Sequence, residues 1–194
     1  MAARIINVSD AWWLSERPSA VLSSGVVALA AVAARDVAPL VEAVNASLDH
    51  LRPWMPWAQE PATQESIGAF VNGAVESWEA CREFQFTIRR ATDEAIVGCC
   101  GLHTRVGSHA LEIGYWVHVD HVGKGLASAA ARCLTKAALK IATVQRVEIH
   151  CDAANGASAA IPKRLGYRLD RIESREPETP GETGQHMVWI QAEG

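Results

Sequence analysis

Long apolar segments are absent from this sequence. The longest nearly unbroken run, Val26–Ala34, is far shorter than the ~20 residues that a membrane-spanning helix needs. The first residues, MAARIINVSDAWW, lack the basic region, apolar core and small-residue cleavage site of a secretory signal peptide. We therefore expect a cytoplasmic protein that does not contact membranes.

An excess of basic residues is also missing. Eighteen Lys and Arg residues stand against 22 Asp and Glu, which gives a net charge of −4 and an isoelectric point near 6.0. This balance argues against a nucleic-acid-binding protein that relies on a basic face. It remains compatible with an acidic cleft that attracts cationic amines.

Paired cysteines, internal repeats and metal-binding motifs are lacking as well. The five cysteines form an odd set without C-x-x-C spacing, so we expect buried free thiols. The histidines show no H-E-x-x-H arrangement, and we predict no metal site. With 194 residues, of which 49% are hydrophobic, the chain predicts a single domain over 1–194. Within that domain, 1–25 form an N-terminal extension of uncertain structure.

Strand and helix patterns alternate along the chain. Three strand patterns separated by short turns, at 83–90, 95–103 and 110–119, predict an antiparallel meander. Strands of both orientations with helices packed against them indicate an α/β or α+β domain. The other predicted strands are 26–33, 144–151, 167–173 and 186–191; the predicted helices are 37–50 capped by Asp36, 64–78 capped by Thr63, 124–141 and 155–165.

Two glycines lie between the 110–119 strand and the helix that follows it, in the stretch HVGKGLAS (121–128). A helix N-terminus after a glycine loop can bind an anion through free backbone N–H groups. A Walker A loop is ruled out because Leu126 follows Gly125, and a Rossmann fingerprint fails at Ser128. The loop alone therefore predicts either a tight turn or a phosphate site of another kind.

The order EIGYWV, VGKGLAS and NGASAAIPKRLGY resembles the GNAT superfamily of N-acetyltransferases over residues 83–174. The resemblance implies a mixed central sheet of about six to seven strands, about four flanking helices, and acetyl-CoA as co-substrate. It also implies that Val122 replaces the Gln or Arg of the family's loop, so that backbone N–H groups bind the pyrophosphate. The residues it assigns to coenzyme A are Trp116, Val117, Val119, Val122, Gly123, Lys124, Gly125, Leu126, Ala127, Ser128, Asn155 and Lys163.

The stretches DHLRPWMPW and LEIGYWV, with an N-x-x-S segment, look like the RimJ/RimL branch of that superfamily. Members of this branch acetylate ribosomal-protein N-termini, and others act on small amines and antibiotics. The resemblance favours an N-terminal α-amine as acceptor and direct transfer in a ternary complex, by a monomer or homodimer. A small-molecule acceptor, or a non-catalytic module that binds coenzyme A or a partner, remains the alternative.

Three residues are candidates for the chemistry. Glu112 lies in an otherwise apolar strand and is the predicted general base, with Glu148 as the alternative. An α-amine has a pKa of about 7.7–8.0, so a modest base suffices. The tyrosine that many GNAT enzymes place seven residues after the helix-opening asparagine is replaced here by Pro162. Ser158 is therefore the predicted acid for the departing thiolate.

An aromatic loop follows the first predicted helix. Trp54, Met55 and Trp57 stand between prolines, which restrain the backbone. They either cover the core or form one wall of the acceptor cleft, because loops on a rigid scaffold often line sites. We assign all three to acceptor binding.

Overall fold

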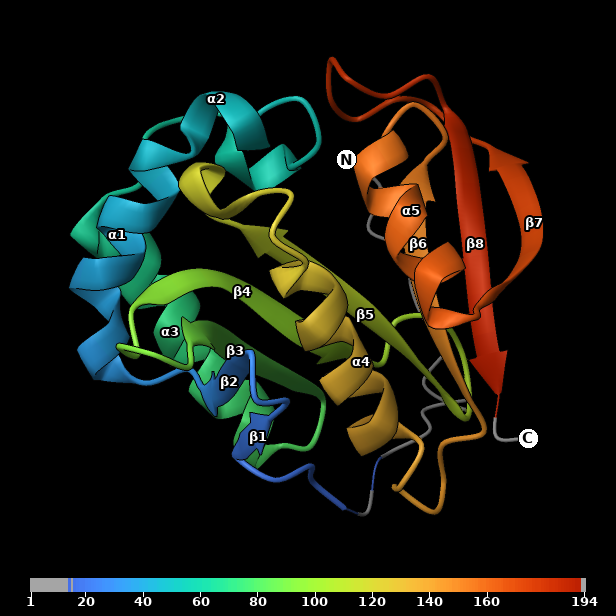
Figure 1. Ribbon diagram of the computed structural model, residues 1–194, viewed down its shortest axis with the longest axis horizontal. Coiled ribbons are helices and arrows are strands. Elements are labelled where there is room, and N and C mark those ends of the chain that lie inside the picture. The colour runs from blue at the N-terminus through green and yellow to red at the C-terminus, as the bar shows by residue number, and fades with distance from the viewer. Residues whose placement is uncertain (1–13, 15, 193–194) are drawn as a thin grey trace.

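A mixed eight-stranded sheet forms the centre of the protein in this computed structural model, which describes Leu14 and residues 16–192 (Figure 1). The strand order is β1-β2-β3-β4-β5-β6-β8-β7, and β5 and β6 are the parallel pair. The strands are β1 Val21–Ser23, β2 Val27–Ala31, β3 Glu83–Arg90, β4 Ile96–His103, β5 Ala110–Val117, β6 Arg146–Asp152, β7 Arg168–Ser174 and β8 Gln185–Ala192.

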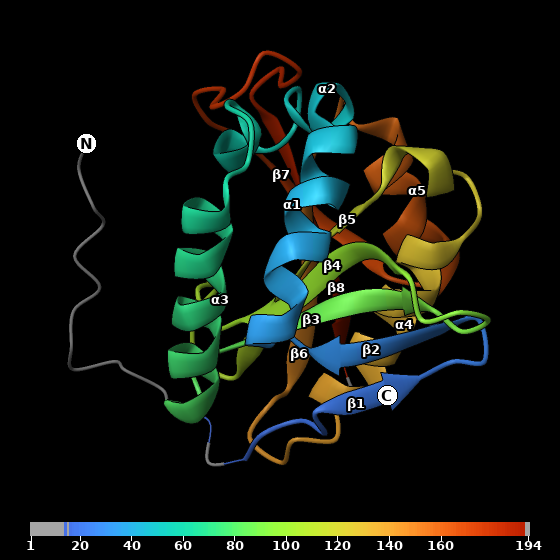
Figure 2. The same cartoon turned by 90° about the vertical axis from the view of Figure 1, so that its left-hand side faces the viewer.

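Helices cover both faces of the sheet. Helices α1 and α3 lie on one face against β4 and β3, whereas α4 and α5 lie on the other (Figures 1 and 2). Each layer has its own hydrophobic cluster, one around Leu40 and Val71 and one around Leu134 and Ile149. The helices are α1 Val37–Ala46, α2 Leu48–Leu51, α3 Gln64–Glu79, α4 Leu126–Ala138 and α5 Gly156–Leu165, with short 3-10 helices η2 Ala34–Asp36, η3 Pro56–Ala58 and η4 Val119–His121.

The predicted GNAT architecture is confirmed, and the sheet has one strand more than the upper expectation. The added strand β1 lies in the segment 1–25, for which no strand or helix was predicted; residues 1–13 and 15 lie outside the described residues. It forms a hairpin with β2 that Gly25 closes at a φ of 75°, a conformation that favours glycine.

Two helix predictions need comment. Thr63 caps α3 as predicted, since its side chain accepts the N–H of Ser66. Asp36 occupies the N-cap position of α1 as predicted, but its side chain makes no capping bond, because its carboxylate accepts the N–H of Ala33 and pairs with Arg89 instead. The helix also breaks at Ser47, whose hydroxyl accepts the N–H of Val119 at 3.1 Å. That bond ties the first helical layer to the end of β5.

The sheet opens between β5 and β6. These strands pair over only three residues each, from Ala110 with Arg146 to Glu112 with Glu148. Beyond Glu112, β5 continues to pair with β4 as far as Val117, while β6 pairs with β8 as far as Asp152. The parallel pair therefore separates and leaves an open edge on β5.

Candidate active site

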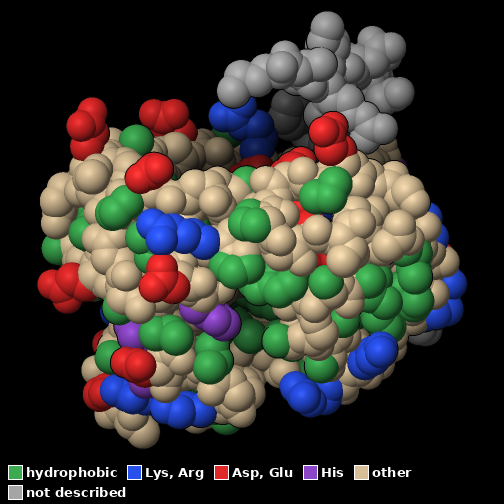
Figure 3. All heavy atoms as spheres, turned by 90° about the horizontal axis from the view of Figure 1, so that it is seen from above, with side chains coloured by type: hydrophobic (Ala, Val, Ile, Leu, Met, Phe, Trp, Pro, Cys, Tyr) green, Lys and Arg blue, Asp and Glu red, His purple; other side chains and the backbone are tan. Residues whose placement is uncertain are grey.

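A cavity of about 920 Å³ lies where β5 and β6 diverge. Its walls come from both sides of the opening, so it joins the aromatic loop, the end of β5 and the start of α5. Figure 3 looks onto this end of the molecule, and hydrophobic side chains extend across the middle of that face. Seven of the predicted site residues line the cavity: Trp54, Met55, Trp57, Glu112, Trp116, Asn155 and Ser158.

The glycine loop leads into α4 next to this opening. Gly123 and Gly125 have φ values of 74° and 76°, in the left-handed region that favours glycine. Gly125 is the N-cap of α4 and has no side chain to bond the first-turn N–H groups, which therefore stay available to an anion. Val122 is 45% exposed and adds no charge. The loop thus fits a pyrophosphate bound by backbone N–H groups.

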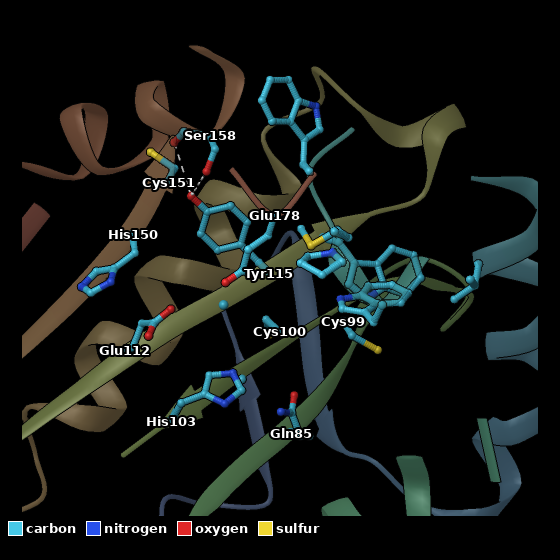
Figure 4. A pocket seen from close by; sticks show the side chains of 18 of the residues that line it. Gln85, Cys99, Cys100, His103, Glu112, Tyr115, His150, Cys151, Ser158 and Glu178 are labelled. Atoms are coloured by element: carbon cyan, nitrogen blue, oxygen red, sulfur yellow. Dashed lines mark hydrogen bonds between the residues drawn. The ribbon is translucent and has the colours of Figure 1, made fainter. Parts of the chain in front are cut away.

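Ser158 meets a tyrosine that the sequence did not indicate. The hydroxyl of Tyr115 on β5 lies 3.1 Å from Ser158 Oγ and also donates to the Ser158 carbonyl (Figure 4). Burial raises the pKa of Tyr115, so its hydroxyl keeps its proton. The pair can supply a proton inside the cavity.

Glu112 reaches the cavity, but it is not free. Both of its carboxylate oxygens accept hydrogen bonds of 2.7 Å from Arg105, which follows β4. Burial alone would raise the pKa of Glu112, but the hydrogen bonds and charge of Arg105, together with the nearby His150 and His103, offset it, so that the pKa lies below its usual value. Glu148 is also buried, paired with Arg146 and His150, and does not belong to the described residues that line the cavity. Of the two candidate bases, Glu112 is the one placed at the cavity.

The family model for the acetyltransferase (GNAT) domain matches residues 27–168. The chain belongs to the GNAT acetyltransferase family. Among its relatives, YdaF of Bacillus subtilis (strain 168), provisionally named a ribosomal N-acetyltransferase, is 27% identical over 73% of this chain and 77% of its own.

Solved GNAT structures share the fold over most of their length. RimJ of Mycobacterium smegmatis in complex with CoA-disulfide is 26% identical, with a TM-score of 0.78 over 90% of this chain and 88% of its own. The microcin C7 self-immunity acetyltransferase MccE, in complex with acetyl-CoA and AMP, is 18% identical, with a TM-score of 0.79 over 87% and 93%. The predicted family, enzyme class and acetyl-CoA co-substrate are confirmed.

The other residues assigned to coenzyme A have visible structural roles in this GNAT domain. Asn155 caps α5 by accepting the N–H of Ser158 at 3.0 Å. Ser128 accepts a bond from Arg164, and Lys163 lies 5.6 Å from the ring centre of Trp189. Helix α5 continues through Pro162. The contacts of these residues with coenzyme A stay predictions.

The aromatic loop and a second loop close the cavity from above. Trp57 lies 6.1 Å from Trp116, ring centre to ring centre, so the aromatic loop rests on the end of β5. The β7–β8 loop, 175–184, reaches across and bonds the Pro53 carbonyl through the Thr179 hydroxyl at 2.7 Å and the Gly181 N–H at 3.0 Å. The sequence showed this segment only as a run of turn residues.

Several residues that line the cavity were not predicted from the sequence. Tyr115 belongs to the same EIGYWV motif as Glu112, so the motif could have indicated it as a site residue. Arg105 lies in a turn that carries no motif. Glu178, on the β7–β8 loop, brings a further carboxylate to the cavity (Figure 4). His150 and His186 are hydrogen-bond neighbours at 3.3 Å on β6 and β8.

The described residues contain neither a membrane-spanning helix nor a metal-binding group of side chains. No helix of Leu14 and 16–192 is long and apolar enough to span a bilayer. Within the same part of the chain, no three His, Cys, Asp or Glu side chains are grouped so that they could hold a metal ion.

Proposed function

We propose that this acetyltransferase transfers an acetyl group from acetyl-CoA to the N-terminal α-amine of a protein or peptide. The observation that supports it best is the single cavity at the β5–β6 opening, which brings together a carboxylate, Glu112, and a hydroxyl pair, Tyr115 and Ser158. The name of YdaF, a ribosomal N-acetyltransferase by its provisional designation, adds support for a ribosomal-protein acceptor. An apolar wall formed by Trp54, Met55 and Trp57 suits the side chains that follow an N-terminal amine.

The chemistry follows from those groups. Glu112 takes one proton from the acceptor ammonium, which leaves a neutral nitrogen. The nitrogen lone pair forms a bond to the acetyl carbonyl carbon, and the carbon–sulfur bond breaks. Ser158, held by Tyr115, donates its proton to the departing thiolate, and the second proton of the nitrogen restores the Ser158 hydroxyl. Glu112 then releases its proton to solvent.

A small amine is the second candidate acceptor. MccE shares only the fold, but it is a self-immunity acetyltransferase whose structure holds acetyl-CoA and AMP. The large cavity, with Arg175 and Glu178 at its walls, would also admit a compact polar acceptor. The apolar wall of Trp54, Met55 and Trp57 favours an acceptor that carries apolar side chains, so the peptide acceptor stands first.

A thiol-release assay with matched acceptors tests the proposal. We expect turnover with unblocked N-terminal peptides of ribosomal proteins and none with the same peptides acetylated at the N-terminus. Amino sugars, polyamines and nucleotide-linked amines form the comparison set. Turnover with small amines and none with peptides would establish the second candidate. Glu112→Gln tests the base, since it should lower kcat by about 10²-fold or more while the affinity for acetyl-CoA is kept.

A further inference from the structure

The ion pair between Arg105 and Glu112 is unequal in its burial. The Arg105 side chain is 56% exposed, whereas that of Glu112 is 10% exposed. Because the Arg105 side chain is half exposed, water can replace the hydrogen bonds that the arginine itself loses when it leaves its partner. The buried carboxylate cannot leave and requires a cationic partner when it is charged. The pair is therefore arranged so that the cation can be exchanged.

A second carboxylate lies close enough to receive Arg105. Glu83, His103 and Glu112 stand opposite one another on β3, β4 and β5, in one row across the sheet. Glu83 attracts the charge of Arg105 and is 38% exposed at its side chain. It lies 3.3 Å from the Nδ1 atom of His103. Arg105 thus has an alternative anion on the solvent side of the row.

We propose that Arg105 is the resting counter-ion of Glu112 and that the acceptor's ammonium group displaces it toward Glu83. This inference rests on the proposed function, because it assigns to the Glu112 carboxylate the binding of a cationic amine. Arg105 is then a positioning residue, which keeps Glu112 ionised between turnovers and does not touch the reacting atoms. The acceptor class it selects is a protonated primary amine.

The exchange also converts Glu112 into a better base. Burial raises the pKa of this carboxyl, and Arg105 is the main group that lowers it. Once Arg105 has moved, burial dominates and the carboxylate binds a proton more readily. The proton passes from the ammonium nitrogen to a Glu112 oxygen, which leaves a neutral amine and a neutral carboxyl. The other titratable groups that face Glu112 are His103 from β4, His150 and Glu148 from β6, and His186 from β8.

Arg105→Gln tests the proposal, with Arg146→Gln as the matched control. Arg146 pairs with Glu148 on the neighbouring strand at 2.6 Å and does not belong to the described residues that line the cavity. We expect Arg105→Gln to move the acid limb of kcat/KM upward by about one pH unit or more. The KM of a peptide acceptor should fall several-fold at a pH where Glu112 is ionised. Arg105→Lys, which keeps the charge, should restore most of the wild-type pH profile.

The affinity for acetyl-CoA, measured by titration calorimetry, should be unchanged in all variants. A wild-type pH profile and acceptor KM in Arg105→Gln would overturn the proposal, as would equal changes in Arg105→Gln and Arg146→Gln. Carbon-13 NMR of the Glu112 carboxyl, with CoA and a peptide acceptor added, tests the exchange of Arg105 for the ammonium group independently of turnover. Addition of the peptide should lower the pKa of Glu112 more in Arg105→Gln, where the ammonium group is a new counter-ion, than in the wild type, where one cation replaces another. If the wild type acetylates no amine, the proposed function fails; an unchanged Glu112 signal on peptide addition overturns the exchange.

Discussion

Asp152 holds the β7–β8 loop over the cavity, and its replacement should loosen that loop. The side chain is 4% exposed and accepts four hydrogen bonds. They come from the N–H of Ala154 at 2.8 Å, the N–H and hydroxyl of Thr183 at 3.0 and 2.8 Å, and the N–H of Gly184 at 3.0 Å. Because the same loop docks on Pro53 and lines the cavity, Asp152 helps to hold one wall of the proposed acceptor site.

These four hydrogen bonds set the loss in free energy of unfolding that follows when the Asp152 carboxylate is removed. A hydrogen bond to a charged group contributes about 1.5–3 kcal/mol. Ala154 and Thr183 are exposed, so water can serve their donors, whereas Gly184 is buried. We therefore expect Asp152→Ala to lower the free energy of unfolding by about 3 kcal/mol, and Asp152→Asn by about 2 kcal/mol, since the amide keeps one acceptor oxygen.

Urea unfolding measures this loss, and steady-state kinetics measures its consequence. The acceptor KM should rise in Asp152→Ala, while the affinity for acetyl-CoA stays at the wild-type value because the glycine loop is remote from β8. Asp170→Asn on β7 is the control, since Asp170 makes ion pairs with Arg168 and Arg171 alone. Wild-type stability in Asp152→Ala, or a loss no larger than in Asp170→Asn, would refute the reasoning.

Four further outcomes are expected. Burial, with Arg175 nearby, lowers the pKa of His186 from 6.5 to about 4. Between these pH values the unfolded state binds a proton that the folded state does not, so the free energy of unfolding should fall by roughly 3 kcal/mol as the pH drops from 6.5 to 4. Thermal unfolding of His186→Gln should therefore depend less on pH than that of the wild type. Gly181→Ala should raise the acceptor KM without changing the affinity for acetyl-CoA, because an added Cβ meets the backbone oxygen of Pro53. Val122→Arg should tighten acetyl-CoA binding about threefold, a gain that calorimetry at high salt should no longer detect. Ser158→Ala should lower kcat about 100-fold in the thiol-release assay with an unchanged Kd for acetyl-CoA, and equal loss of both would point to misfolding instead.

Much of the fold could be predicted from the sequence, because strands and helices depend on local residue patterns. The apolar spacing that predicted the strands reflects burial on a sheet, and Thr63 and Asn155 cap helices through bonds to residues three positions away. The capping bond expected from the Asp36 side chain does not form, because its carboxylate pairs with a residue distant in the sequence, Arg89. Strand β1 was missed because three residues carry too little pattern to stand out.

The sequence by itself determined the family, the glycine loop and the candidate acid and base, since these are set by residue type and spacing along the chain. Tertiary structure alone decided their partners. Arg105 reaches Glu112 only through the geometry of the β4–β5 turn, and Tyr115 reaches Ser158 across the opening between β5 and β6. Thr179 meets Pro53 over a separation of 126 residues. Such contacts depend on which strands lie side by side and where they part, and no local pattern specifies that.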